Sequence, residues 1–238
     1  MSSLKLLAIE TSSPLGSIAL GVGDDITERT IATPREQTTR VLAIINELLA
    51  DAGLKLDDLD ALVFGRGPGS FTGIRVAAAV TQGLSLASGR PIVSISSLAV
   101  LAQRGDNPSD AADAASTVAG SGVRRTLCCL DARMNEVYWA SFTSVDGLVE
   151  AESEERIGPP EAVTGPPSPF LALGDGFAAY SQVLAPVIKL AEAVDTSMKP
   201  GARELLTLGA ADVRAGRFVS LEAALPVYLR EADAWRRG

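Results

Sequence analysis

Short apolar runs separated by turn residues predict a strand-rich beginning to the chain. Leu4–Ile9 is apolar, Ser17–Val22 alternates between apolar and small residues, and Ser12–Gly16 between them has turn chemistry. These segments predict a β-hairpin. A third strand is expected at about Thr27–Ala32.

The next stretch has the periodicity of an amphipathic helix. Within Glu36–Ala52 the apolar residues follow the i, i+3, i+4, i+7 spacing of one helix face, and they are Val41, Ile44, Ile45, Leu48 and Leu49. Gly53 then predicts the end of this helix.

A strand, a glycine-rich turn, a helix and a strand follow in that order. They are expected at Ala61–Phe64, Gly65–Gly69, Phe71–Ala87 and Pro91–Ser94. Helices that alternate with strands after an opening hairpin predict a mixed α/β unit whose sheet has an antiparallel side.

A second unit is expected after a connection that lacks bulky periodic residues. Strands are predicted at Thr126–Leu130, at Glu136–Thr143 after a turn at Asp131–Asn135, and at Phe170–Leu173, with helices from Phe177 onward. This unit repeats the opening hairpin, which suggests a duplicated fold. The predicted organisation is a unit at 1–103, a flexible connection at 104–125 and a unit at 126–238, whose tail could return to either unit.

Composition excludes several classes of chemistry. None of the 238 residues is histidine, so zinc peptidase motifs of the HExxH type and histidine-assisted nucleophiles have no imidazole to use. The formal net charge is −8, which argues against sequence-independent nucleic-acid binding by this chain alone. Any role on tRNA would need a basic partner.

Two adjacent cysteines lie inside an apolar run. Cys128 and Cys129 would point to opposite faces of a strand, so we expect reduced core thiols, with a vicinal redox switch as the alternative. Reduced thiols, together with the absence of a visible secretion signal or membrane span, predict a cytoplasmic protein.

A carboxylate and small hydroxyls lie at the end of the first predicted strand. Glu10, Thr11 and Ser12, followed by Ser13, could hold a metal-bound phosphate of a nucleotide. The alternative is a plain turn with side-chain to backbone hydrogen bonds.

The richest motif runs from Gly65 to Arg75. Glycine permits close backbone approach, Ser70 is a good N-cap, and a helix N-terminus can accept an anion. The motif lacks the Gly-Lys-Ser/Thr of a Walker loop, and a tight strand-to-helix turn explains it equally well.

The helix after this motif carries a ladder of small residues. Gly73, Ala77, Thr81 and Ser85 recur every four residues, which lets another element approach closely. The ladder could pack within the chain against Glu36–Ala52 or meet the same helix pair of a partner protein.

Two further turns could carry chemistry. Asp131, ahead of Arg133, could act as an acid or base, and Gly174-Asp175-Gly176 could face a nucleotide. Both are also ordinary turn sequences, and neither decides the function.

Six motifs, in order along nearly the whole chain, resemble the bacterial TsaB (YeaZ) family of tRNA threonylcarbamoyladenosine biosynthesis. The motifs are Leu7-Ala8-Ile9-Glu10-Thr11-Ser12, Gly67-Pro68-Gly69-Ser70-Phe71-Thr72-Gly73-Ile74-Arg75, Ser96-Ser97-Leu98, Asp131-Ala132-Arg133 before Glu136-Val137-Tyr138, Gly174-Asp175-Gly176, and Pro226-Val227-Tyr228-Leu229-Arg230. The nine-residue glycine motif is the most specific of them.

The resemblance implies an α/β, actin-like ATPase (ASKHA, ribonuclease H-like) fold with two related subdomains, the second reduced. It implies a non-catalytic subunit that pairs with TsaD as a heterodimer, activates it and helps recruit TsaE. TsaD transfers a threonylcarbamoyl group to the adenine beside the anticodon, so tRNA would be met only through the complex. No cofactor or metal is expected on this chain, and ATP/ADP and metal are expected on the partner subunits.

The resemblance also suggests a partner-binding surface on the two predicted helices. A homodimer of the isolated chain is compatible with it, and no membrane contact is expected. The expected contact residues are Gly67, Pro68, Gly69, Ser70, Phe71, Thr72, Gly73, Arg75, Ala77, Thr81, Arg40 and Ile44.

An alternative function is an actin-like phosphotransferase. Glu10, Thr11 and Gly67–Gly69 would then hold ATP and Mg²⁺, and Asp131 would act as the base. A metallopeptidase, a role ascribed to relatives, lacks ligands in a chain without histidine.

Overall fold

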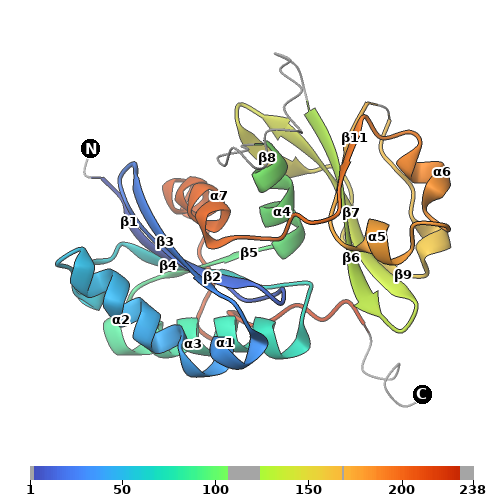
Figure 1. The fold of residues 1–238 in the computed structure, drawn as a ribbon. Coiled ribbons are helices and arrows are strands. Elements are labelled where there is room, and N and C mark those ends of the chain that lie inside the picture. Colours follow the sequence, from blue (N-terminus) through green and yellow to red (C-terminus); the bar gives the residue numbers. More distant parts are fainter. Residues whose placement is uncertain (1–2, 107–123, 168, 231–238) are drawn as a thin grey trace. The chain divides into compact units, whose positions relative to one another are not determined.

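The computed structural model describes residues 3–106, 124–167 and 169–230 (Figure 1). The chain forms two compact units. The first contains the residues up to Val100 together with Pro200–Val227, and the second contains Leu101–Lys199 and the C-terminal residues from Tyr228. The sequence predicts units at 1–103 and 126–238 and leaves open whether the tail returns to the first unit, to which Pro200–Val227 belongs. The expected connection at 104–125 lies mostly outside the described residues.

A five-stranded sheet forms the centre of the first unit. Its strands are β1 (Lys5–Glu10), β2 (Gly16–Val22), β3 (Asp25–Ile31), β4 (Ala61–Gly65) and β5 (Ile92–Ile95). The order is β3-β2-β1-β4-β5, in which β2 is antiparallel to β1 and β3, while β4 and β5 continue parallel to β1. The predicted hairpin and its third strand are confirmed.

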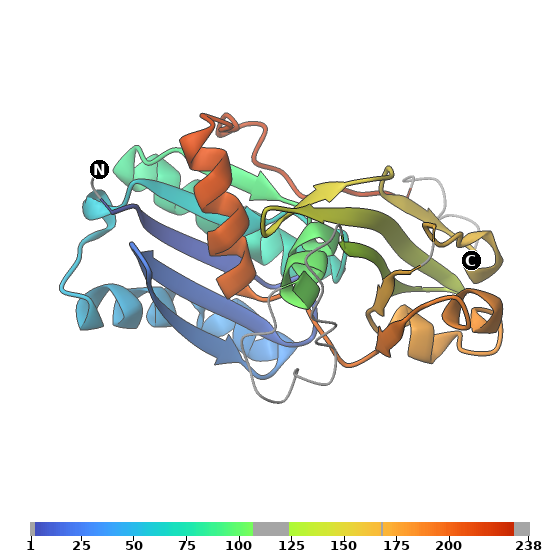
Figure 2. The ribbon, with the colours of Figure 1, turned by 90° about the horizontal axis from the view of Figure 1, so that it is seen from above.

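Helices cover both faces of this sheet. On one face lie α1 (Pro34–Thr39), α2 (Val41–Asp51) and α3 (Phe71–Ser88), and α7 (Ala202–Arg214) crosses the other (Figures 1 and 2). A short 3-10 turn, η1 (Leu56–Asp58), precedes β4. Between the sheet and α2–α3 lies a core that includes Ile9, Ile45 and Phe64. Burying each such side chain contributes about 1.5–3 kcal/mol.

The second unit repeats this architecture around a second sheet. Its strands are β6 (Arg124–Arg133), β7 (Glu136–Val145), β8 (Leu148–Ala151), β9 (Arg156–Gly158), β10 (Leu171–Leu173) and β11 (Ala193–Asp195). The order is β11-β10-β6-β7-β8, with β9 also paired to β7. As in the first sheet, antiparallel strands lie on one side of the central strand and parallel strands on the other. The predicted duplicated, actin-like α/β fold is confirmed.

Short helices complete the second unit. They are the 3-10 turn η3 (Pro160–Ala162), α5 (Gly176–Ala179) and α6 (Ala185–Ile188), and the last two pack with Cys129, Trp139 and Phe170 in a separate core. Helix α4 (Ser97–Asp106) begins in the first unit and ends in the second. No helix among the described residues combines the length and the apolar character that crossing a membrane requires.

The predicted helix at Glu36–Ala52 is wrong as a single element, because the chain breaks into α1 and α2 at Arg40. Thr38 and Thr39 donate their hydroxyl hydrogens to the Arg35 carbonyl oxygen, at 2.8 and 3.2 Å. Such local side-chain bonds compete with the regular helix and favour its interruption.

Three other local expectations also changed. Asp131 lies inside β6, which continues to Arg133 through a register shift, so the predicted turn is shorter than expected. Helix α4 and the short strands β8, β9 and β11 were not predicted. The three strands have only three or four residues each, which leave too little periodicity to recognise in a sequence.

Cys128 and Cys129 are free, buried thiols, as predicted. Burial raises the pKa of both thiols, and the nearby carboxylates of Asp175 and Asp131 raise that of Cys129 further. Both therefore remain protonated and unreactive at neutral pH, which disfavours the redox-switch alternative.

Candidate functional site

The β1–β2 turn, where the sequence suggested a phosphate site, is closed by the protein's own atoms. Glu10 and Thr11 are fully buried and Ser12 is almost so. The Glu10 carboxylate accepts the backbone N–H of Ser12 at 2.6 Å and the hydroxyl hydrogen of Ser97 at 3.1 Å. Burial raises the pKa of Glu10, and these hydrogen bonds oppose the rise only in part.

The glycines of the Gly65–Arg75 motif press directly against this turn. A Cβ at Gly65 would lie 2.1 Å from the Glu10 carboxylate, and a Cβ at Gly73 would lie 1.7 Å from the Thr11 carbonyl oxygen. The Thr11 hydroxyl donates to the Gly73 carbonyl at 2.7 Å. Glycine is therefore needed here for packing, which favours the tight-turn interpretation over a phosphate cradle.

The N-terminus of α3 is similarly occupied. The Ser70 N–H donates to the Ser12 carbonyl at 2.6 Å, and the Ser70 hydroxyl caps the helix by accepting the Gly73 N–H at 3.4 Å. Because Glu10, Thr11 and Ser12 are packed shut, the arrangement does not fit an ATP–Mg²⁺ complex.

We expect Glu10→Gln to stabilise the protein at neutral pH. A buried carboxyl with a raised pKa binds its proton more tightly in the folded state. The contribution of Glu10 to the free energy of unfolding therefore falls as the pH rises from the pKa of the unfolded state, about 4.5, toward the higher pKa of the folded state. Glutamine carries no charge, its amide oxygen can accept the Ser12 N–H, and its NH2 group can donate to the Ser97 hydroxyl oxygen in place of the present bond. Thermal melts from pH 4 to 8 should show a gain for the variant that grows with pH.

The matched control for this prediction is Glu47→Gln, since Glu47 has a half-exposed side chain on α2. A stability difference for Glu10→Gln that does not change with pH, or that matches the Glu47→Gln control, would contradict the assignment of Glu10 as the buried titrating group.

The small-residue ladder of α3 faces inward and not toward a partner. Gly73, Ala77 and Thr81 are buried within the first unit, where α3 packs on β4 and β1. Ile44 on α2 is also buried, in the same core. These four residues, which were predicted to contact a partner, are therefore enclosed within the first unit in this conformation. The ladder lets the helix approach the sheet closely.

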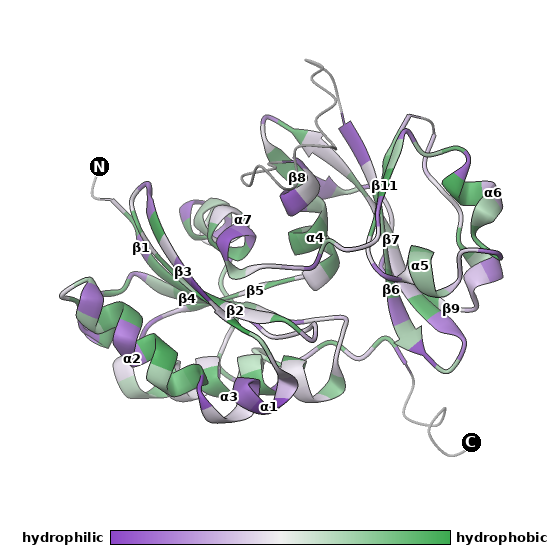
Figure 3. Cartoon of the chain, viewed as in Figure 1, coloured by the Kyte–Doolittle hydropathy of each residue, from purple (hydrophilic) through white to green (hydrophobic). Residues whose placement is uncertain are grey.

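The opposite side of α3 is exposed and almost without charge. In its 18 residues Arg75 is the sole ionisable side chain, and it stacks over the Phe71 ring with its Cζ 3.5 Å from the ring centroid. Phe71 is 46% exposed and Leu86 76%, and Ala79 and Gly83 between them are also exposed. Figure 3 shows hydrophobic stretches along α3 and the neighbouring α2, where Leu42 is exposed as well.

We call Phe71, Arg75, Ala79, Gly83 and Leu86 the α3 face. Five of the residues predicted to contact a partner are exposed: Ser70, Phe71, Thr72 and Arg75 at the start of α3, and Arg40 beside α2. Three others are not exposed, since Gly67 and Pro68 are buried and Gly69 is partly buried. Ala79, Gly83 and Leu86 were missed. The near absence of charge in a long helix was the signal that could have identified them.

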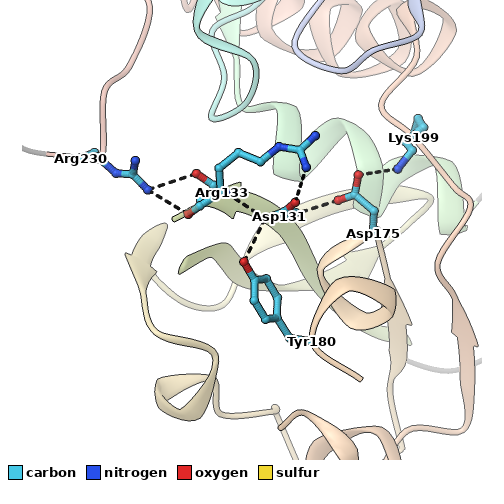
Figure 4. A network of polar contacts seen from close by, with 7 residues as sticks. Asp131, Arg133, Asp175, Tyr180, Lys199 and Arg230 are labelled. Atoms are coloured by element: carbon cyan, nitrogen blue, oxygen red, sulfur yellow. Dashed lines mark hydrogen bonds and ion pairs between the residues drawn. The ribbon is translucent and has the colours of Figure 1, made fainter. Parts of the chain in front are cut away.

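The second unit holds a polar network around Asp131 and Asp175 (Figure 4). Asp131 pairs with the Arg133 guanidinium at 2.9 Å and accepts the Tyr180 hydroxyl hydrogen at 3.2 Å. Asp175 pairs with Lys199 at 2.6 Å and accepts the Asp131 N–H at 3.0 Å. Both carboxylates are thus held by hydrogen bonds and ion pairs within the second unit, an arrangement typical of structural turn residues.

Among residues 3–106, 124–167 and 169–230, no group of three or more Cys, Asp or Glu side chains is placed to hold a metal ion.

Comparisons with known proteins agree with this architecture. Residues 31–236 match the family model described as TsaD, tRNA N6-adenosine threonylcarbamoyltransferase. The tRNA threonylcarbamoyladenosine biosynthesis protein TsaB of Escherichia coli strain K12 is 31% identical over 98% of each chain. The protein of the same name from Haemophilus influenzae is 33% identical over 100% of this chain and 98% of its own. The chain belongs to the TsaB (YeaZ) family.

Solved structures of the TsaB (YeaZ) family support the same assignment. YeaZ from Pseudomonas aeruginosa superposes with a TM-score of 0.81 at 35% identity, covering 96% of this chain and all of that one. A second Pseudomonas aeruginosa structure, described as similar to peptidase YeaZ, gives a TM-score of 0.83 at 35% identity over 97% of this chain.

Proposed function

We propose that this protein is a non-catalytic subunit in tRNA threonylcarbamoyladenosine biosynthesis, and that it pairs with a TsaD-type protein through the α3 face. Membership in the TsaB family supports the pathway. The observation that supports the pairing is the exposed side of α3, which lacks acidic and lysine side chains over 18 residues. A long helix in water normally carries charges on its outer side, so this face is suited to burial against another protein.

The proposed partner has the same fold family, since this chain itself matches a model built for TsaD. An apolar helix face can then pack on the equivalent helix of the partner in a two-fold arrangement. The same face would also let two copies of this chain associate when TsaD is absent. Transfer of the threonylcarbamoyl group would take place on TsaD, the nucleotide and metal would bind to the partner subunits, and tRNA would contact this chain only through the complex.

Two features argue against the phosphotransferase alternative. Glu10 is fully buried under Gly65 and hydrogen-bonded to Ser12 and Ser97, and Asp131 is paired with Arg133. A peptidase of the histidine-dependent classes is excluded because the chain has no histidine.

Reconstitution of the modification reaction tests this function. TsaD and TsaE from the same organism, threonylcarbamoyl-AMP and a tRNA substrate are incubated with and without this protein, and modified adenosine is measured. We expect product only, or at least about tenfold more, when this protein is present. Equal product without it, or product from this protein alone, would contradict the proposal.

A further inference from the structure

Gly83 lies in the interior of α3, where a glycine is unfavourable. The helix spans Phe71–Ser88, so Gly83 is more than one turn from either end and caps neither of them. In a helix interior glycine is less favourable than alanine, because it loses more conformational freedom on folding and has no side chain to pack. A glycine at this position therefore needs a structural reason.

The folded chain does not supply this reason. No atom of the described residues would lie within 4 Å of a Cβ at Gly83, and its backbone is helical. Other glycines of the first unit do have a reason. Gly73 and Gly209 are pressed against neighbouring residues, and Gly53 and Gly89 have left-handed φ values of 65° and 69°. Because an alanine would fit at position 83 of the isolated chain, the glycine points to a neighbour outside it.

The surroundings of Gly83 are suited to contact with another helix. Ala79 and Ala87, one turn before and one turn after it, are exposed and have only methyl side chains, and Leu86 beside them is 76% exposed. An approaching helix can bring its backbone against Gly83 while Leu86 packs along its side. Phe71–Ser88 contains no acidic or lysine side chain that would lose its water in such a contact.

We propose that Gly83 is the point at which a helix of the TsaD-type partner crosses α3 in backbone contact. This inference rests on the function proposed above, and it adds where on the α3 face the partner lies and what the partner must present. The partner helix must carry small side chains at the crossing, because a bulky residue there would hold the two backbones apart. Gly83 therefore favours a closely packing helix and disfavours proteins with a bulky residue at that point. A TsaD-type protein can present an equivalent helix, since the residues of this chain that match the TsaD family model, 31–236, include all of α3.

Substitution of Gly83 by alanine should have opposite effects on the isolated chain and on the complex. Alone, Gly83→Ala should melt about 1–4 °C above the wild type, because alanine favours the helix. Its affinity for TsaD should nevertheless be about tenfold lower, since the added methyl group would separate the two backbones. Gly83→Leu should lower the affinity at least about 100-fold for the same reason. Calorimetry with purified TsaD from the same organism measures these affinities, and thermal melts measure the stability of each variant.

The matched control is Ala215→Leu, which adds an exposed leucine at the end of α7 on the other face of the sheet and should bind TsaD like the wild type. Wild-type affinity in both Gly83 variants, with affinity lost in Leu86→Asp, would overturn the crossing at Gly83 and leave the α3 interface standing. If the wild type itself does not bind TsaD, the proposed function and this inference both fail. Loss of self-association alone, with unchanged binding to TsaD, would place a second copy of this chain at Gly83 and also overturn the inference.

Discussion

Leu86→Asp should weaken binding to TsaD by at least about 100-fold while leaving the fold of this protein intact. Leu86 is 76% exposed, so an aspartate there touches no core side chain and the unfolding temperature should stay within about 1–2 °C of the wild type. In a complex buried through the α3 face, the carboxylate would lose its water without gaining a partner. That cost is several kcal/mol, and 100-fold in affinity corresponds to about 2.7 kcal/mol.

The binding measurement is calorimetry or light scattering with purified TsaD. Ala79→Glu on the same face should behave like Leu86→Asp. Val183→Asp is the matched control, because Val183 is also an exposed apolar residue, at 41%, but lies in the second unit. Wild-type affinity in both α3 variants, or an equal loss in Val183→Asp, would contradict the interface assignment.

Gly73→Ala should destabilise the first unit by about 3 kcal/mol or more. The new Cβ would lie 1.7 Å from the Thr11 carbonyl oxygen, which is a backbone atom and cannot move aside as a side chain would. To relieve this clash, α3 must shift away from β1. That shift disrupts the Thr11–Gly73 hydrogen bond and the packing of α3 on the sheet. Thermal or urea unfolding of the variant should show a lower midpoint or no cooperative transition for this unit.

Gly83→Ala is the control within the same helix. Nothing lies within 4 Å of a Cβ at Gly83, and its backbone is helical, so alanine should stabilise the helix by about 0.5–1 kcal/mol. Equal effects of the two substitutions would show that the destabilisation at Gly73 is not caused by contact with Thr11.

The sequence was informative about long, strongly patterned elements. The hairpin of β1 and β2, the α3 helix with its Ser70 cap and the second hairpin of β6 and β7 all follow from periodicity and turn residues. Short strands could not be predicted in this way. A three-residue strand such as β11 is defined by pairing with β10, and a contact between distant segments leaves no local pattern.

The sequence correctly placed the candidate partner-binding surface on α3, but it did not indicate which side of this helix faces outward. Small residues at four-residue spacing in α3 correctly indicated a close contact along Gly73, Ala77 and Thr81. They could not indicate whether the neighbour was a sheet of the same chain or another protein. Burial in the folded chain decided that question and moved the candidate interface to the other side of the helix.

The β1–β2 turn likewise shows that residue types alone do not reveal whether a ligand can reach them. Glu10, Thr11 and Ser12 are residue types that bind phosphate when their side chains are accessible. The glycines that seemed to make room for a ligand instead make room for these residues, since Gly65 borders Glu10 and Gly73 borders Thr11. Whether a glycine admits a ligand or the protein's own backbone depends on three-dimensional packing.

The solution mass of the wild-type protein mixed with TsaD from the same organism, measured by light scattering after gel filtration, tests the proposed role most directly. We expect a one-to-one complex at micromolar concentration, formed even where the isolated protein is a homodimer, and no such complex with Leu86→Asp. A mixture that elutes as two separate proteins at these concentrations would contradict the proposal that this chain acts as a partner subunit of TsaD.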